Sequence, residues 1–315
     1  NRKNMRIVFM GTPDFAVESL KVLVENNYNV VGVVTMPDKP AGRGHKIQYS
    51  AVKQYALDNN LLILQPEKLK DPQFLDELRA LNADVQVVVA FRMLPEVVWN
   101  MPPQGTFNLH ASLLPQYRGA APINRAIMNG ETETCATTFF LTHEIDNGKI
   151  ILQEKIPVLP EDNAGTIHDK LMVMGAQMVR KTIDMLAKGK TDAVDQSQFI
   201  SHDTELKAAP KIFKEDCELL SSLGVEQAHN FVRGLSPYPG SWINIILPGQ
   251  TEKQVLKIFE TEKEFCAHND EPGTFVTDLK KTAKIALTDG YLILKQIQVP
   301  GKKRMETGEY LRGLR

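Results

Sequence analysis

Cysteine is scarce in this chain. Its 315 residues include only Cys135, Cys217 and Cys266, which lie far apart and form no C-x-x-C pair. This odd and sparse set argues against a disulfide framework and against a cysteine-based zinc site. The motif H-E-x-x-H is also absent, which speaks against a zinc deformylase or peptidase, and we expect no metal.

Net charge is nearly absent as well, because 37 Lys and Arg residues oppose 38 Asp and Glu residues. The molecule as a whole is therefore not drawn strongly to nucleic acid or to anionic membrane, and RNA binding requires local clusters of basic residues. The sequence shows no secretory leader and no long apolar span. We expect a cytoplasmic protein that does not associate with membranes.

The length and the 43% apolar content are those of a protein with two well-packed domains. Up to residue 188, strand patterns alternate with helix patterns. The strand-like runs lack polar alternation, which indicates strands buried on both faces in a parallel sheet. The expected strands cover residues 6–10, 30–35, 61–64, 84–90, 106–109 and 136–141, and the expected helices cover 15–24, 51–58, 72–81 and 165–187.

The pattern changes after residue 188. A polar, aperiodic stretch over 189–209 is the best linker candidate. Beyond it, a helix at 223–234 is followed by short strands at 241–246, 255–259, 273–276, 284–287 and 291–298, which favour a small β-barrel. We therefore predict an α/β protein with a Rossmann-like, mostly parallel-sheet domain over 1–188, a linker, and an OB-like barrel domain over 210–315.

The first strand ends at Gly11-Thr12-Pro13-Asp14. This is a strand-to-helix turn, but it is not G-x-G-x-x-G, so the dinucleotide-binding signature is missing. Taken alone, the stretch is explained by a structural turn, with Asp14 in the first turn of the following helix.

Two polar side chains lie at the end of a predicted strand. Asn108 and His110 are two residues apart, so they leave the strand on the same face. An amide and an imidazole converging on one point can stabilise a developing oxyanion, and ligands bind at the ends of parallel strands in open α/β sheets. A hydrogen-bonded histidine in a turn remains an equally good interpretation of these two residues alone.

Asp146 follows the next predicted strand, in Ile145-Asp146-Asn147-Gly148. A carboxylate beside a histidine can orient it, keep it protonated and relay a proton. By itself, however, this tetrapeptide is a turn signal.

Together these motifs resemble the formyltransferase family that uses 10-formyltetrahydrofolate, and within it the members that act on methionyl-tRNA. The likeness extends over nearly the whole chain. It is carried by Gly11-Thr12-Pro13-Asp14-Phe15-Ala16, by residues 37–44, by Asn108-x-His110 with Ser112-Leu113-Leu114-Pro115, by residues 117–123, by Asp146-x-Gly148, by residues 209–212 and by residues 236–242.

The resemblance implies direct attack of the methionine α-amine of initiator methionyl-tRNA on the formyl carbon of 10-formyltetrahydrofolate, for translation initiation. It makes Asn108, His110 and Asp146 the catalytic set. The chain would act as a monomer without a covalent intermediate, since no Ser or Cys nucleophile paired with a base is apparent.

The remaining predicted contacts come from the same resemblance. Ser112, Leu113, Leu114 and Pro115 match the segment that lines the folate site, and Arg43 lies in the loop that enters the tRNA acceptor stem. Lys39 and Lys46 in that Pro- and Gly-rich loop, and Lys211 beyond the linker, are further expected tRNA contacts. An ordinary solvated loop is the alternative for residues 37–46.

One departure stands near the predicted folate site: Arg92 occupies a position where the family more often has glycine. Two other functions also remain open. A formyltransferase acting on a sugar nucleotide or on glycinamide ribonucleotide would keep the same three catalytic residues. A non-catalytic tRNA-binding protein would have no use for them.

Overall fold

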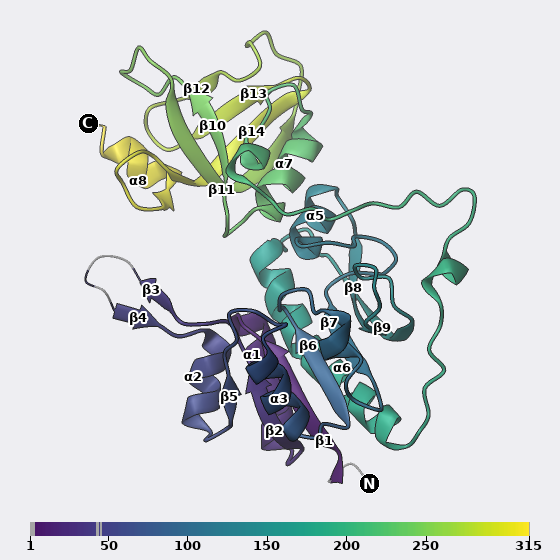
Figure 1. Ribbon diagram of the computed structural model, residues 1–315. Helices are drawn as coiled ribbons and strands as arrows, with labels where there is room; N and C mark the ends of the chain where they lie inside the picture. Colours follow the sequence, from purple (N-terminus) through teal and green to yellow (C-terminus); the bar gives the residue numbers. More distant parts are fainter. Residues whose placement is uncertain (1–3, 42–43, 45, 315) are drawn as a thin grey trace. The chain divides into compact units, whose positions relative to one another are not determined.

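A computed structural model describes residues 4–41, 44 and 46–314 of the chain (Figure 1). Two compact units share these residues. The first comprises the described parts of Asn1–Gly119, Thr134–Ile156 and His168–Ala208, and the second those of Ala120–Glu133, Pro157–Ile167 and Ala209–Arg315. Two segments that precede residue 188 thus belong to the second unit, and the domain bounds expected from the sequence stay a prediction.

The first unit is built on a seven-stranded sheet with the order β5-β2-β1-β6-β7-β8-β9. Every pairing from β5 to β7 is parallel, and β8 is antiparallel to β7. The predicted Rossmann-like, mostly parallel sheet is therefore confirmed. Its strands are β1 (Arg6–Gly11), β2 (Asn29–Val34), β5 (Ile63–Leu64), β6 (Val85–Val89), β7 (Thr106–His110), β8 (Glu133–Phe140) and β9 (Ile150–Pro157).

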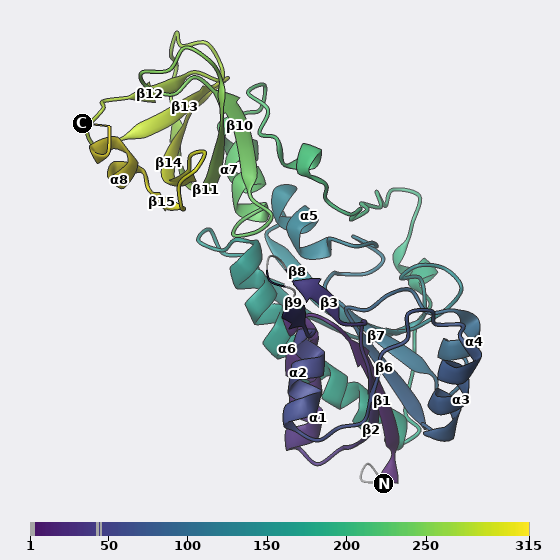
Figure 2. The same ribbon diagram turned by 60° about the vertical axis from the view of Figure 1, so that its left-hand side comes forward.

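Helices cover both faces of this sheet (Figure 2). One face carries α1 (Asp14–Glu25), α2 (Ala51–Asp58) and α6 (Ala164–Ala187), and the other carries α3 (Pro72–Ala80) and α4 (Glu96–Trp99). On the α3 side, Val8, Met10 and Val88 of the strands form a core with Phe74 and Leu78 of the helix. Coverage on both sides explains why these strands are apolar throughout.

The parallel strands β1, β6 and β7 end at the same edge of the sheet, at Gly11, Val89 and His110. At Gly11 a side chain would lie 2.7 Å from both the Ala16 Cβ and the Val89 carbonyl oxygen, so only glycine lets α1 begin this close to the strands. This edge, here called the ligand edge, is where open α/β sheets bind their ligands.

A short hairpin, which the sequence pattern did not predict, projects after β2. Its strands β3 (Lys39–Ala41) and β4 (Lys46–Gln48) pair in an antiparallel register with Lys39 opposite Gln48. At its base the carboxylate of Asp38 accepts hydrogen bonds from Lys53 Nζ at 2.7 and 2.9 Å and from Gln65 Nε2 at 2.8 Å. The Lys53 ammonium group lowers the pKa of Asp38.

The second unit contains a curled antiparallel sheet with the order β10-β11-β14-β13-β12, and β15 pairs with β14. It agrees with the expected small OB-like barrel domain. The helix α7 contributes Val225, Ala228 and Val232 to a core shared with the sheet. The elements are α5 (Pro122–Met128), α7 (Val225–Gly234), β10 (Ser241–Ile245), β11 (Gln254–Phe265), β12 (Phe275–Thr277), β13 (Ala283–Leu287), β14 (Gly290–Gln298), β15 (Met305–Glu306) and α8 (Thr307–Arg312).

Across the described residues, no helix combines the length and the apolar character needed to span a membrane.

Candidate active site

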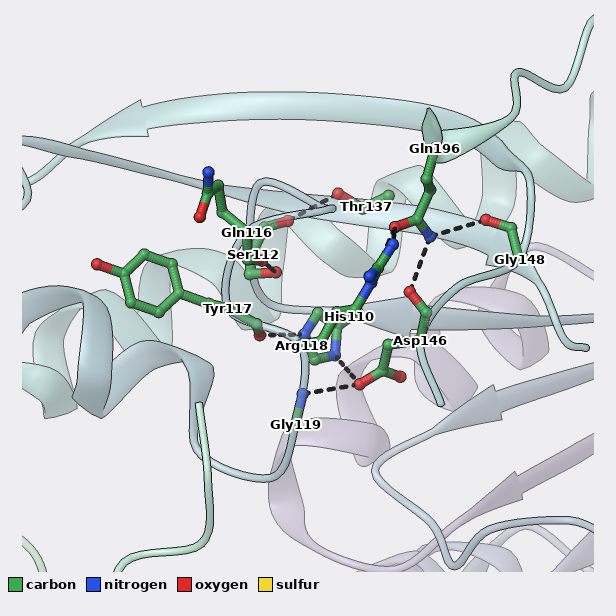
Figure 3. Close-up of polar contacts among 10 residues, drawn as sticks. All are labelled: His110, Ser112, Gln116, Tyr117, Arg118, Gly119, Thr137, Asp146, Gly148 and Gln196. Atoms are coloured by element: carbon green, nitrogen blue, oxygen red, sulfur yellow. Dashed lines mark hydrogen bonds and ion pairs between the residues drawn. The ribbon is translucent and has the colours of Figure 1, made fainter. Parts of the chain in front are cut away.

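His110 is the last residue of β7 and is held at both ring nitrogens (Figure 3). It is only 7% exposed. Its Nε2 lies 2.9 Å from the carbonyl oxygen of Tyr117, and its Nδ1 lies 3.8 Å from Oδ2 of Asp146. Because a carbonyl oxygen only accepts, Nε2 must carry a hydrogen, and a second hydrogen on Nδ1 would complete an ion pair with Asp146.

Asp146 lies beside His110 although the strand before it, β8, is antiparallel to β7. The end of β8 pairs with Phe107, at the start of β7, so the chain must return over the following loop to bring Asp146 to His110. Gly148 makes this return possible, because a side chain there would lie 1.4 Å from the Phe140 carbonyl oxygen. The Oδ2 atom of Asp146 also accepts a hydrogen bond of 3.0 Å from the Gly119 amide.

Backbone strain occurs on both sides of the His110 ring. Both residues that face its ring nitrogens, Tyr117 (φ 57°) and Asp146 (φ 53°), adopt the left-handed conformation. For residues other than glycine this costs about 1–2 kcal/mol each, and it persists only where the surroundings enforce it. Such strain is commonly found at functional sites.

Asn108 leaves β7 on the same face as His110, as the sequence predicts, since two residues along a strand restore the same direction. Its Oδ1 atom is buried and has no hydrogen-bond partner among the described residues. An unpaired buried polar atom costs about 1–3 kcal/mol. The amide of Asn108 is therefore not explained by the requirements of folding alone.

The segment predicted to line the folate site forms a buried turn. Ser112 is fully buried and donates a 2.7 Å hydrogen bond to the Gln116 carbonyl oxygen, while Leu114 packs against Phe139 and Ile150. Pro115 is buried too, and Leu113 is half-buried. Three of these four side chains are thus directed into the protein, and the role of the segment in folate binding stays a prediction.

Two residues at the site carried no functional assignment in the sequence. Arg118 donates from Nη2 to Asn147 Oδ1 at 2.6 Å and to Gln196 Oε1 at 2.8 Å. Gln196 donates from Nε2 to the carbonyl oxygens of Asp146 and Gly148, both at 2.8 Å. Arg118 lies within a motif that carries the family resemblance, whereas Gln196 lies in the stretch predicted to be a linker, where no sequence signal marked it.

Arg92, which departs from the family pattern near the predicted folate site, joins two loops at the ligand edge. Its Nη1 and Nη2 atoms donate to the carbonyl oxygens of Glu67 and Pro66 at 2.8 and 2.7 Å. Partial burial lowers the pKa of its guanidinium. The side chain therefore turns away from bulk solvent and ties the segment after β6 to the segment after β5.

The residues predicted to contact tRNA fall in three places. Lys39 and Lys46 are exposed on the β3–β4 hairpin, and its register puts both on the same face. Arg43 lies outside the described residues. Lys211 belongs to the second unit, where its Nζ lies 5.5 Å from the centroid of the Phe213 ring. This geometry does not test tRNA contact, which stays a prediction.

Comparison with known families shows to which family the chain belongs. Residues 5–183 match the model of a family described as formyl transferase, and residues 211–315 match that of the formyl transferase C-terminal domain. The chain belongs to the formyl transferase family. The resemblance to the formyltransferase family is thereby confirmed, and the two family models match the two halves of this formyl transferase.

Relatives of high identity match this formyl transferase over its length. The methionyl-tRNA formyltransferase of Bacteroides thetaiotaomicron is 58% identical, and the match covers 100% of this chain and 97% of the relative. The methionyl-tRNA formyltransferase of Flavobacterium johnsoniae is 50% identical, and the match covers 99% of this chain and 97% of the relative.

Solved structures share the fold at lower identity. WlaRD, a sugar 3N-formyl transferase crystallised with dTDP and 5-N-formyl-THF, has a TM-score of 0.63 and 20% identity over 95% of this chain and 99% of its own. HypX from Aquifex aeolicus in complex with tetrahydrofolic acid has a TM-score of 0.62 and 17% identity over 98% of this chain and 47% of its own. At such identities the likeness concerns the fold alone.

Proposed function

We propose that this formyl transferase moves the formyl group of 10-formyltetrahydrofolate onto the α-amine of methionine carried by initiator methionyl-tRNA. One observation carries the proposal: Asn108 and His110 share a face at the end of β7, and His110 Nδ1 lies 3.8 Å from Asp146 Oδ2, in a chain that matches methionyl-tRNA formyltransferases over its full length. Because its proposed substrate is a charged tRNA, we expect the enzyme to act in the cytoplasm during translation initiation.

The three side chains divide the chemistry among them. The amine nitrogen forms a bond to the formyl carbon, and the carbonyl electron pair moves onto the formyl oxygen. The Asn108 amide donates to that oxygen, and the positive charge of protonated His110 stabilises it. Asp146 holds His110 in place from 3.8 Å and takes the proton of the attacking amine through a water. When the tetrahedral species collapses, the bond to N10 of the folate breaks, and N10 takes up the proton that left the amine.

The surrounding elements supply the substrates. Folate binds along Ser112, Leu113, Leu114 and Pro115 at the end of β7. The hairpin with Lys39 and Lys46, together with Arg43, contacts the acceptor stem of the tRNA. In the proposed division of the chain, residues 1–188 perform catalysis, 189–209 connect, and 210–315, with Lys211, recognise the tRNA.

The acceptor decides between this function and its alternatives. Purified protein is incubated with 10-formyltetrahydrofolate and, in parallel, with charged initiator methionyl-tRNA, an amino-sugar nucleotide and glycinamide ribonucleotide. We expect transfer to the tRNA at a kcat/KM at least 100-fold above that for the other two. Preferential transfer to a small amine contradicts the proposed substrate. Tight binding of the tRNA without transfer to any acceptor supports a non-catalytic binding protein instead.

A further inference from the structure

The segment predicted to be a linker is fastened to the candidate active site at two points. At one end, Val194 and Ile150 exchange backbone hydrogen bonds of 2.8 and 2.9 Å, next to η2 (Gln196–Phe199). At the other end, Lys207 accepts from the Tyr117 amide at 2.6 Å, and Ala208 forms a bridge with Arg118. Residues 194–208, here called the strap, thus lie along the two loops that hold His110.

Gln196 is the residue of the strap that reaches deepest. It is fully buried, and its side-chain amide is engaged at both ends. Its nitrogen donates to the carbonyl oxygens of Asp146 and Gly148, and its oxygen accepts from Arg118 Nη2 at 2.8 Å and Nε at 3.3 Å. One side chain therefore links the loop that carries Asp146 to the segment whose backbone holds His110 (Figure 3).

The contacts of Gln196 act where the backbone is strained. Asp146 holds its left-handed conformation with its carbonyl oxygen bonded to Gln196 and its carboxylate bonded to the Gly119 amide. Without the Gln196 amide, the carbonyl oxygens of Asp146 and Gly148 would lose this donor, and the loop could relax toward an ordinary conformation. The carboxylate of Asp146 would then move away from His110.

We propose that Gln196 is a positioning residue for Asp146, so that the strap forms part of the active site. This inference rests on the proposed function, in which Asp146 acts on His110 and on the amine. Displacement of a catalytic group by about 1 Å typically costs about 100-fold in rate. Because Gln196 touches neither proposed substrate, its loss should reduce kcat and leave KM unchanged.

Two variants separate positioning from packing. Gln196→Leu removes all four hydrogen bonds at similar volume. Gln196→Glu keeps an acceptor for Arg118 but removes the donor to the Asp146 and Gly148 carbonyl oxygens. Gln198→Leu is the matched control, because Gln198 belongs to the same short helix and is exposed. Urea unfolding establishes that each variant is folded before kinetics are measured.

We expect both Gln196 variants to lose at least tenfold in kcat with methionyl-tRNA, with the KM of each substrate within twofold of wild type. Hydrogen exchange provides a readout independent of activity: the Gly119 amide, which donates to Asp146, should exchange faster in both variants and not in Gln198→Leu. A smaller loss of kcat in folded Gln196→Glu, a loss confined to KM, or an unchanged Gly119 amide overturns the inference. If wild type does not formylate methionyl-tRNA, the proposed function fails, while the exchange at Gly119 still tests the positioning.

Discussion

At the scale of single residues, backbone groups contact both His110 and Asp146 in the candidate site. His110 is fixed by the Tyr117 carbonyl oxygen, and Asp146 by the Gly119 amide. Backbone partners keep their place when side chains vary, so the sequence pattern around the proposed catalytic set specifies conformation as much as chemistry. Asn108 is the exception, since its Oδ1 atom has no partner among the described residues.

That exception leads to a prediction in which activity and stability move in opposite directions. Asn108→Leu removes the proposed oxyanion donor and the unpaired buried oxygen together. We expect kcat for formyl transfer to fall by roughly 10²–10³-fold. The free energy of unfolding should stay equal or rise by about 1 kcal/mol. Single-turnover rates and urea denaturation measure the two quantities.

Gln86→Leu serves as the control for this change, because Gln86 is fully buried in the neighbouring strand β6 and has no proposed role. Its activity should stay within twofold of wild type. If Asn108→Leu keeps its activity while remaining folded, Asn108 is not the oxyanion donor.

The same residues show what a sequence can predict of a site. Asn108 and His110 were recognisable because strand periodicity alone puts both side chains on one face at a strand end. Asp146 required the family pattern, since β8 is antiparallel and only the folded loop returns it to His110. Gln196 gave no signal, because a glutamine in a polar stretch acquires meaning only from its partners in space.

At the scale of elements, burial explains which parts of the fold were predicted. The sheet strands β1, β2 and β6 are apolar and were expected within one residue of their observed ends. The β9 strand and the second half of β11 were missed because half-buried and exposed Glu and Lys residues interrupt their apolar pattern. The β3–β4 hairpin was missed because strands of three residues are too short to show periodicity.

The hairpin carries a prediction about substrate binding. Replacing both Lys39 and Lys46 by Gln should raise the KM for methionyl-tRNA several-fold and leave kcat unchanged, because the hairpin stands apart from the reacting atoms. The dependence of log KM on log salt should become shallower by about 1 for each lysine that neutralises a phosphate. Kinetics at several salt concentrations measure both effects.

Lys188→Gln is the control for the hairpin variant. Lys188 is exposed just beyond the end of α6. This end of α6 lies at the edge of the sheet opposite the ligand edge, because nearby Asp184 is hydrogen-bonded to Tyr28, the residue before β2. This variant should behave as wild type. An unchanged KM and salt dependence in the Lys39 and Lys46 variant would show that the hairpin does not contact tRNA phosphates.

In the second unit, His229 of α7 should make stability depend on pH. Burial, with further contributions from Arg233 and Lys263, lowers the pKa of His229 below its ordinary value of 6.5, and its Nδ1 lies 2.8 Å from Thr261 Oγ1. Below pH 6.5 the unfolded chain therefore binds this proton more readily than the folded unit. The free energy of unfolding of the second unit should fall as the pH drops through this range.

His229→Gln, which keeps a polar group beside Thr261, should remove this part of the pH dependence. Urea unfolding at pH 7.5 and 5.5, followed by the fluorescence of Trp242 in a Trp99→Phe background, compares the variant with wild type. Equal losses of stability in both proteins on acidification would show that His229 is not the responsible group.

At the scale of the whole molecule, the two units do not follow one cut in the chain. Residues 120–133 and 157–167 join the second unit, although the sequence shows no change of character there. Within that unit, Asn124 Nδ2 donates to the Gly234 carbonyl oxygen at 2.9 Å, and Arg233 Nη1 donates to the Asp162 carbonyl oxygen at 3.0 Å. Contacts of this kind link residues distant in sequence and leave no periodic trace, so the sequence could not predict them.

In the proposed mechanism, this formyl transferase uses His110 to move a formyl group onto methionyl-tRNA. The most direct test compares the rate of transfer from 10-formyltetrahydrofolate to initiator methionyl-tRNA in wild type, His110→Ala and His143→Ala, since the His143 side chain is 71% exposed and has no proposed role. This mechanism predicts robust transfer by wild type and His143→Ala, and a loss of roughly 10²–10⁴-fold in His110→Ala with the KM for tRNA little changed. Wild-type transfer that survives in folded His110→Ala, or no transfer by wild type at all, would contradict it.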